Sequence, residues 1–552
     1  MNQIEFKGNQ DKIIIVVFFT IYFIVGLLIY RDYGVSTDEP VERRHGIVTA
    51  TYLVNKIDTF LFGSYSPPPL VNLKGRTVVD LVEVRGVPSL ENYRDKIYGS
   101  IYSLFLYYLE QALGIGPESA GIFYLRHLVN FCLFFVAVIF FYKIARDRWD
   151  DWRLGLLAAA FLILSPRIFA ESFYNNKDVA FLSVFIIAWY FLILFLREKT
   201  LRTAWWAAFF SALAVNVRIV GVILPSLIIP FYSWEIFKRT DRRIKKHFLL
   251  LGTYLLVLVF FIIILWPYLW SSPATNFLAA FSSMAHYDPG REHLGLYFGQ
   301  VVSSQQLPWH YVPVWLLITT PLLYSLLFVV GLGVLIFNII KAIKNRVYSL
   351  ELSLDLLTAS LFFVPLAAII IFNSWLYNGW RQMYFMAAPF LLLGVSGFSS
   401  LYNYLRKKNK KALGRNILVG GLVVYLVFIA WQIIVDHPYQ NVYFNSWAGE
   451  VENRFDRDYW GLSYRAALEY IVQHDNRPNI TVSVNSAIGA VNLIMLDIPD
   501  RRRLNFTTED KADYILTEFT GQNNCSYKDE IKSFYSGHIK IMGIYPGRQK
   551  CL

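Results

Sequence analysis

The chain contains 552 residues, of which 55% are hydrophobic, 17% aromatic and only 17% charged. Together with a mean hydropathy of +0.40, this composition is typical of a polytopic membrane protein and excludes a purely soluble enzyme and a disordered regulator. The three cysteines include no Cys-x-x-Cys pair, so a disulfide-built secreted module is excluded as well.

Apolar runs long enough to cross a bilayer begin near the N-terminus and recur as far as residue 435. The hydrocarbon core requires roughly 20 apolar residues in a helix, and the run at 204–215 is the shortest candidate. The sequence therefore predicts a mainly α, polytopic membrane protein with about 11 transmembrane helices. The expected spans are residues 13–30, 121–142, 154–170, 179–196, 204–215, 219–237, 248–266, 312–340, 356–372, 383–401 and 417–435.

The net charge of +12 is accompanied by clusters of Lys and Arg in alternate connections between these spans. Cytoplasmic loops carry such an excess, so the clusters indicate a cytoplasmic N-terminus and exclude nucleic acid as a partner. The alternation requires residues 97–115, which contain Glu110, to lie at the outer interface or to re-enter the membrane instead of spanning it. The clusters lie within residues 143–153, 197–202, 238–246, 341–346 and 406–411.

The segments of unusual composition then fall on the outer side of the membrane. One is a long first loop at residues 31–120, and another is the tail, which returns to the composition of a soluble protein. We expect a transmembrane domain over residues 1–435 and a small extracytoplasmic α/β domain over residues 436–552. Short strands are expected at 480–484, 514–516 and 539–544.

Two adjacent acids, Asp38 and Glu39, follow the first span within a few residues. One interpretation is structural, because Ser36 or Thr37 would cap a helix whose first turn favours acidic side chains. The other is catalytic: one carboxylate would act as a general base, and its neighbour would orient it or bind substrate hydroxyls. The residues alone leave both interpretations open.

A second polar group occurs at residues 165–178, where Asn176, Lys177 and Asp178 lie at a span boundary on the same side. Lys177 and Asp178 would either pair with each other or contribute separately to a site. Cations are also predicted at this membrane face, where charges are costly and commonly functional, although Arg218 alone would also fit a side chain that reaches out to the interface. These cations are Arg126, His127, Arg218 and Arg381.

Acids that can accept a proton, combined with several cations that can hold a phosphate, indicate group transfer from a phosphate-linked donor. The sequence contains no Gly-x-Gly-x-x-Gly or Walker-type nucleotide loop. The acids also face away from the cytoplasmic pools of nucleotide sugars. A sugar linked to a polyprenyl phosphate is therefore the expected donor.

Several motifs together resemble the GT-C superfamily of membrane glycosyltransferases. The most similar group is that of the protein O-mannosyltransferases and the lipid A aminoarabinose transferases, including bacterial family 39-like enzymes. The resemblance covers the membrane portion and depends on the order of the motifs and their common side. The motifs are Asp38-Glu39, Asn176-Lys177-Asp178 and the segments 216–221, 307–315 and 378–385.

This resemblance implies an inverting transfer in which Asp38 deprotonates the acceptor hydroxyl and Glu39 positions the acceptor, with Asp178 as a second acid. It implies that Lys177 and two arginines, Arg218 and Arg381, bind the donor phosphate, and that neither a metal nor another cofactor takes part. The acceptor would be a cell-envelope glycan, a lipid or a protein. The residues expected to line an acceptor pocket are Arg126, His127, Asn176 and His310.

The resemblance also implies a multi-pass protein of the bacterial inner membrane with an extracytoplasmic C-terminus. Segments 436–445 and 458–465 are similar to a stretch found in bacterial members of the group. They would fasten the outer domain to the membrane surface through aromatic side chains or line the acceptor cleft. The alternative function is a lipid-linked sugar transporter or flippase, which would need no catalytic base.

Overall fold

The computed structural model describes residues 9–62, 88–238, 244–284, 293–407, 412–520 and 527–549. Most of these residues are helical, and a small sheet lies near the C-terminus, which confirms the predicted fold class. The basic residues at 239–243 and 408–411, which belong to two expected cytoplasmic connections, lie outside the described residues.

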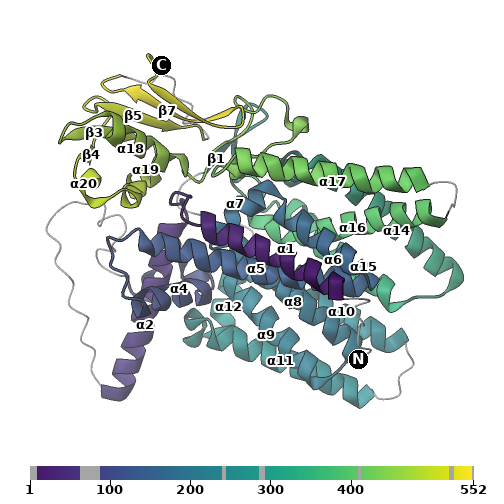
Figure 1. Cartoon of the computed structure of the whole chain (residues 1–552). Coiled ribbons are helices and arrows are strands. Elements are labelled where there is room, and N and C mark those ends of the chain that lie inside the picture. Colours follow the sequence, from purple (N-terminus) through teal and green to yellow (C-terminus); the bar gives the residue numbers. More distant parts are fainter. Residues whose placement is uncertain are drawn as a thin grey trace.

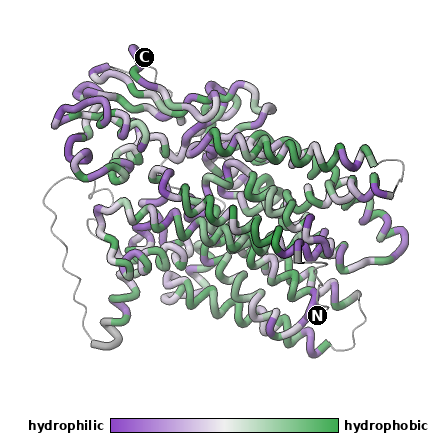
Figure 2. The backbone as a smooth tube through the Cα atoms, viewed as in Figure 1, coloured by the Kyte–Doolittle hydropathy of each residue, from purple (hydrophilic) through white to green (hydrophobic). Residues whose placement is uncertain are grey.

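Nine helices within the described ranges are long and apolar enough to cross a membrane. They run side by side, and Figure 2 shows hydrophobic residues along most of their length, so the chain is an integral multi-pass membrane protein. Seven of them lie in α1 (Asn9–Ile29), α5 (Gly121–Trp149), α8 (Asp178–Glu198), α11 (Ile244–Ile264), α14 (Leu322–Asn345), α15 (Leu350–Ile371) and α17 (Ala412–Val435). The other two combine η3 (Ile219–Val222) with α10 (Ile223–Lys238), and η5 (Arg381–Met386) with α16 (Ala387–Lys407).

The predicted number of about 11 spans differs from the structure at two of the expected segments. Residues 154–170 form α6 (Trp152–Ile163) and α7 (Pro166–Tyr174), which meet at 70° and count as a tenth span only if the pair is taken together. The break falls at Pro166, which cannot continue the hydrogen bonding of α6. Helix α9 (Leu201–Val217) has only 17 residues, or about 26 Å at 1.5 Å per residue, less than the roughly 30 Å core.

Other helices lie at the same end of the bundle as the sheet. Helix α2 (Glu39–Phe62) packs on α4 (Ile101–Ala112), whose 12 residues are too few to span, in agreement with the expectation that residues 97–115 do not cross the membrane. The expected span at 312–340 is divided by Pro321 into α13 (Tyr311–Thr319) and α14. The remaining elements here are η1 (Leu90–Asn92), η2 (Arg94–Ile97), η4 (Pro267–Trp270), α12 (Pro273–Ser283), η5 (Arg381–Met386) and the antiparallel hairpin β1 (Leu294–Tyr297) and β2 (Gln300–Ser303).

The C-terminal region contains a five-stranded sheet in the order β4-β3-β5-β7-β6. Strand β3 pairs in parallel with β4 and β5, whereas β7 pairs antiparallel with β5 and β6, so the three predicted strands are confirmed. The elements are η6 (Gln440–Val442), η7 (Ser446–Ala448), α18 (Ser463–His474), β3 (Ile480–Val484), α19 (Ala487–Val491), η8 (Asn492–Met495), α20 (Ile498–Arg501), β4 (Leu504–Phe506), β5 (Tyr514–Glu518), β6 (Lys532–Ser536) and β7 (Ile539–Pro546).

The sheet lies at one end of the bundle, and α1 begins at the opposite end (Figure 1). The loop after α1 joins the two parts. Val35 exchanges two backbone hydrogen bonds with the Asn492 amide, at 2.9 and 3.0 Å, and Arg465 donates to the carbonyl of Tyr33 at 3.1 Å. Most of the buried apolar side chains of the two parts form one continuous core. These contacts fix the loop that carries Asp38.

Candidate active site

The loop between α1 and α2 separates the roles of the two adjacent acids. Helix α2 begins at Glu39, whose Oε2 accepts a hydrogen bond from the backbone N–H of Ser36 at 2.8 Å. The other oxygen, Oε1, lies 3.1 Å from Nε2 of His127, and both side chains are fully buried. Glu39 thus lies in the first turn of α2, where the structural interpretation expects an acid. The hydroxyls of Ser36 and Thr37, however, donate to the carbonyl oxygens of Tyr174 and of Tyr459 and Trp460 instead of capping the helix. Asp38 faces a different set of partners.

The side chain of Arg381 contacts two carboxylates, those of Asp38 and Asp178. Nη1 of Arg381 lies 2.7 Å from Oδ2 of Asp38 and 2.8 Å from Oδ2 of Asp178. Arg381 and Asp178 are buried, but 19% of the Asp38 side chain remains exposed. Residues 38, 178 and 381 are far apart in sequence, so the fold brings together three of the side chains that the sequence predicts for the site.

Asp178 is held in place by neighbours that the sequence reading did not single out. The side-chain oxygen of Asn175 accepts the backbone N–H of Asp178 at 2.8 Å and so caps the start of α8. The Asn175 amide donates to Glu171 at 2.8 Å, and Tyr384 donates to the same carboxylate at 2.7 Å. An Asn three residues before an acidic helix start is a recognisable capping signal, but the link to Tyr384 depends on the tertiary fold.

The other two predicted cations complete the cluster. Arg218, at the end of α9, pairs with Oδ1 of Asp178. Lys177 does not pair with its neighbour Asp178; its Nζ lies 2.8 Å from Glu42 and 3.8 Å from the centre of the Tyr98 ring. Both cations are about one-sixth exposed, like Asp38. The side of the cluster open to solvent thus carries one acid and two cations.

The cluster controls the charge of Asp38. Burial alone would raise the pKa of this carboxyl, but Arg381, Lys177 and Arg218 outweigh that effect and hold the pKa below its usual range. Asp38 is therefore ionised at neutral pH, as a general base must be. Because the base is partly exposed and lies beside cations, the arrangement suits removal of a proton next to a bound anion.

Some predicted pocket residues lie elsewhere. Arg126 donates to Glu110 at 2.9 Å, and Arg126 and His127 are both buried, so neither is open to a ligand. His310 hydrogen-bonds Tyr297 at 2.7 Å, in the hairpin region. Asn176 is buried beside Lys177 and Asp178, and within the described part of the chain its side-chain amide has no hydrogen-bond partner.

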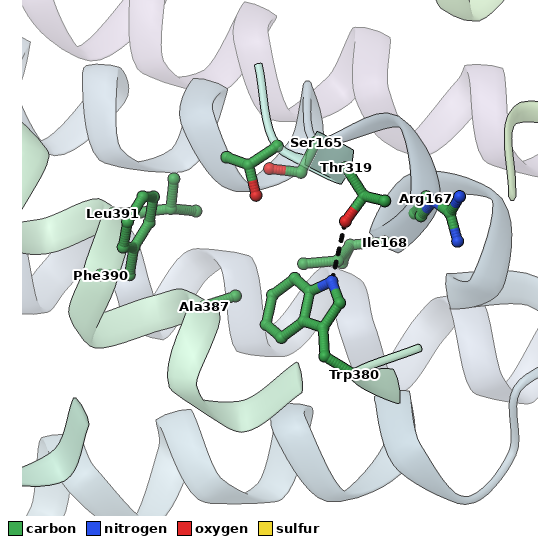
Figure 3. Close-up of a pocket in the computed structure, with 9 residues that line it drawn as sticks. Ser165, Arg167, Ile168, Thr319, Trp380, Ala387, Phe390 and Leu391 are labelled. Carbon is green, nitrogen blue, oxygen red and sulfur yellow. Dashed lines mark hydrogen bonds between the residues drawn. The ribbon is translucent and has the colours of Figure 1, made fainter. Parts of the chain in front are cut away.

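The backbone next to Arg381 borders a small pocket between α7, α13 and α16. Its lining includes Ser165, Arg167 and Trp380. The indole nitrogen of Trp380 points toward Thr319 and donates to its hydroxyl at 2.8 Å (Figure 3). Since Trp380 directly precedes Arg381, this anchor limits the movement of the arginine.

The C-terminal region also reaches the cluster. The guanidinium of Arg381 lies 5.1 Å from the ring centre of Tyr459 and 4.7 Å from that of Trp460. A third ring, that of Tyr377, lies at 5.1 Å. The sequence did not identify these aromatic residues as neighbours of Arg381, because no pattern along the chain links residue 381 to residues 459 and 460.

The fold is that of a polytopic membrane protein, and a cluster of acids and cations lies at the end of its spans. Both features agree with the class that the sequence resembles, the membrane glycosyltransferases. Residues 125–266 match the family model described as dolichyl-phosphate-mannose-protein mannosyltransferase. This match confirms the resemblance to the GT-C superfamily of membrane glycosyltransferases.

Two solved structures of one protein are similar to this chain. The first is that of ArnT from Cupriavidus metallidurans in the apo state, at 13% identity and a TM-score of 0.45, covering 88% of this chain and 76% of that one. The second is the same protein bound to undecaprenyl phosphate, at 11% identity and a TM-score of 0.46, covering 96% and 97%. No curated protein matches the sequence.

Proposed function

We propose that the protein is an inverting glycosyltransferase that moves a sugar from a polyprenyl-phosphate donor to a hydroxyl acceptor at the outer face of the membrane. One observation carries the proposal: the ionised, partly exposed carboxylate of Asp38 lies 2.7 Å from Arg381, in a cluster that also holds Lys177 and Arg218. A base beside three cations suits a reaction that takes a proton from one group and leaves negative charge on another.

In the proposed reaction, Asp38 accepts the proton of the acceptor hydroxyl. The acceptor oxygen attacks the anomeric carbon, and the bond from that carbon to the phosphate oxygen breaks. The electron pair leaves with the polyprenyl phosphate, where Arg218, Lys177 and Arg381 stabilise the developing charge. A single displacement inverts the anomeric configuration. Asp178 keeps the two arginines in position.

The proposed setting follows from the topology expected from the basic loops. We place the N-terminus in the cytoplasm and the C-terminal region, residues 436–552, as an extracytoplasmic domain of a bacterial inner-membrane protein. The spans provide an apolar surface for the lipid tail of the donor. The acceptor would be a cell-envelope glycan, a lipid or a protein, and the mannosyltransferase-type family match supports a hexose donor.

The test is transfer of radiolabelled sugar from a panel of polyprenyl-phosphate sugars to membrane acceptors by purified wild type and Asp38→Asn. Asp32→Asn is a matched control, because Asp32 lies on the same loop but pairs with His437 at 2.9 Å and is 48% exposed. We expect transfer by the wild type and the control, and a loss of at least about a hundredfold in Asp38→Asn. No transfer with any donor, despite intact folding and lipid binding, would refute the proposal and favour a flippase.

A further inference from the structure

The C-terminal region supplies two aromatic residues to the cluster at the membrane face. From these contacts we infer that Tyr459 is a positioning residue of the active site, holding Arg381 against Asp38. The C-terminal region then completes the catalytic centre and does more than fasten itself to the membrane. This inference rests on the proposed function and assigns one part of it to a segment beyond the spans.

Residues 459–460 contact both sides of the Asp38–Arg381 pair. Nη2 of Arg381 lies 3.4 Å from the Tyr459 hydroxyl, and the Tyr459 ring faces the guanidinium. On the other side of the pair, the hydroxyl of Thr37, next to Asp38, lies 3.4 Å from the carbonyl oxygen of Tyr459 and 3.3 Å from that of Trp460. One short segment therefore contacts the loop of the base and the side chain of its cation.

The segment is itself fixed by buried polar contacts. The carboxylate of Asp458 is fully buried and accepts hydrogen bonds from the Ser463 backbone at 2.9 Å, the Ser463 hydroxyl at 2.6 Å and the Asn441 amide at 3.2 Å. Gly461 follows with a φ of +69°, and a Cβ there would lie 2.4 Å from Ile488. Only glycine fits this turn without strain. The position of Tyr459 is thus set by the folded C-terminal region.

Fixing Arg381 matters because this one side chain contacts two carboxylates. An arginine has several rotatable bonds, and aromatic faces on its guanidinium restrict where it can lie. Loss of Tyr459 removes one ring face and the polar contact at Nη2, so that Arg381, still paired with Asp178, can turn away from Asp38. The charged groups that face Asp38 are Arg381, Lys177 and Arg218, so Asp38 would then depend on Lys177 and Arg218.

The test compares Tyr459→Leu, which keeps apolar bulk, with Tyr459→Phe, which keeps the ring. Tyr535→Ala serves as the control, because Tyr535 lies on β6 and is 52% exposed. We expect Tyr459→Leu to lower kcat/KM at least about tenfold and to move the acid limb of the pH profile upward by about one pH unit. Tyr459→Phe should stay within about threefold of wild type with an unchanged limb.

A readout independent of activity is amide hydrogen exchange of η5 and of the loop that carries Asp38. Exchange in both should accelerate in Tyr459→Leu and remain unchanged in Tyr535→Ala. An unchanged acid limb and unchanged exchange in Tyr459→Leu, whatever its overall activity, would overturn the inference. Inactivity of the wild type would instead refute the proposed function, and the exchange measurement would still decide whether Tyr459 holds the cluster.

Discussion

Glu110 of α4 joins three helices through one buried carboxylate. Its side chain has no exposed surface and accepts hydrogen bonds from Arg43 of α2 at 2.6 Å and from Arg126 of α5 at 2.9 Å. We predict that Glu110→Gln destabilises the protein strongly, because the change removes the negative charge that two buried guanidinium groups share. Arg43 is 5% exposed and Arg126 only 1%, so water cannot replace the lost partner.

Removing one partner of a buried ion pair costs about 3–5 kcal/mol, and the contact with two arginines places Glu110 within that range. The free energy of unfolding should be measured in mixed micelles by denaturant titration, followed by tryptophan fluorescence. Glu118→Gln is the matched control, because Glu118 is exposed just beyond α4. This control should stay within about 0.5 kcal/mol of the wild type.

The effect should also depend on pH. Burial alone would raise the pKa of Glu110, but the two arginines outweigh it and hold the pKa below its usual range. The stabilisation is therefore present above the unfolded-state pKa of about 4.3 and is lost as the pH falls through the folded-state value. A difference under about 1 kcal/mol at neutral pH, or one that grows in acid, would refute this reasoning.

Three further predictions concern the cluster. Asn175→Ala should lower kcat in the transfer assay by about tenfold to a hundredfold, because Asp178 loses the side chain that orients it. It should also lower the free energy of unfolding by about 1–3 kcal/mol, because the buried Asn175 caps α8 and donates to Glu171. In Gly99→Ala, the added Cβ would lie 1.6 Å from the carbonyl oxygen of Asn216, two residues before Arg218. The change should therefore destabilise the fold by more than about 1 kcal/mol and raise the donor KM. An unchanged melting temperature and an unchanged KM would contradict this prediction. The kcat/KM should stay flat from pH 7 down to about 5, and fall only below the usual pKa of about 3.9, because the pKa of Asp38 is lowered and the ionised form is active; a limb near pH 6 would exclude Asp38 as the base.

The spans and the members of the cluster could be predicted because their signals lie along the chain. Apolar runs report membrane helices, and an acid such as Asp38 next to a span is costly enough to indicate a role. The 3.1 Å contact between His127 and Glu39 inside the protein could not be predicted, because no pattern along the chain links residue 39, at the start of α2, to residue 127 in α5. Tyr459 was hidden for the same reason: its partner is 78 residues away in sequence.

The cluster pairs equal numbers of opposite charges, and this balance bears on how the enzyme would release its product. Asp38, Asp178 and Glu42 carry three formal negative charges, which Arg381, Arg218 and Lys177 neutralise. A free inorganic anion would therefore find no net positive charge in the cluster. The donor would be bound through its lipid and its sugar as well, so its binding would not require a net positive charge. In the proposed reaction, protonation of Asp38 gives the cluster one positive charge while the leaving phosphate gains one negative charge. Return of that proton to water would restore neutrality and weaken the hold on the spent lipid, so turnover would be tied to proton release.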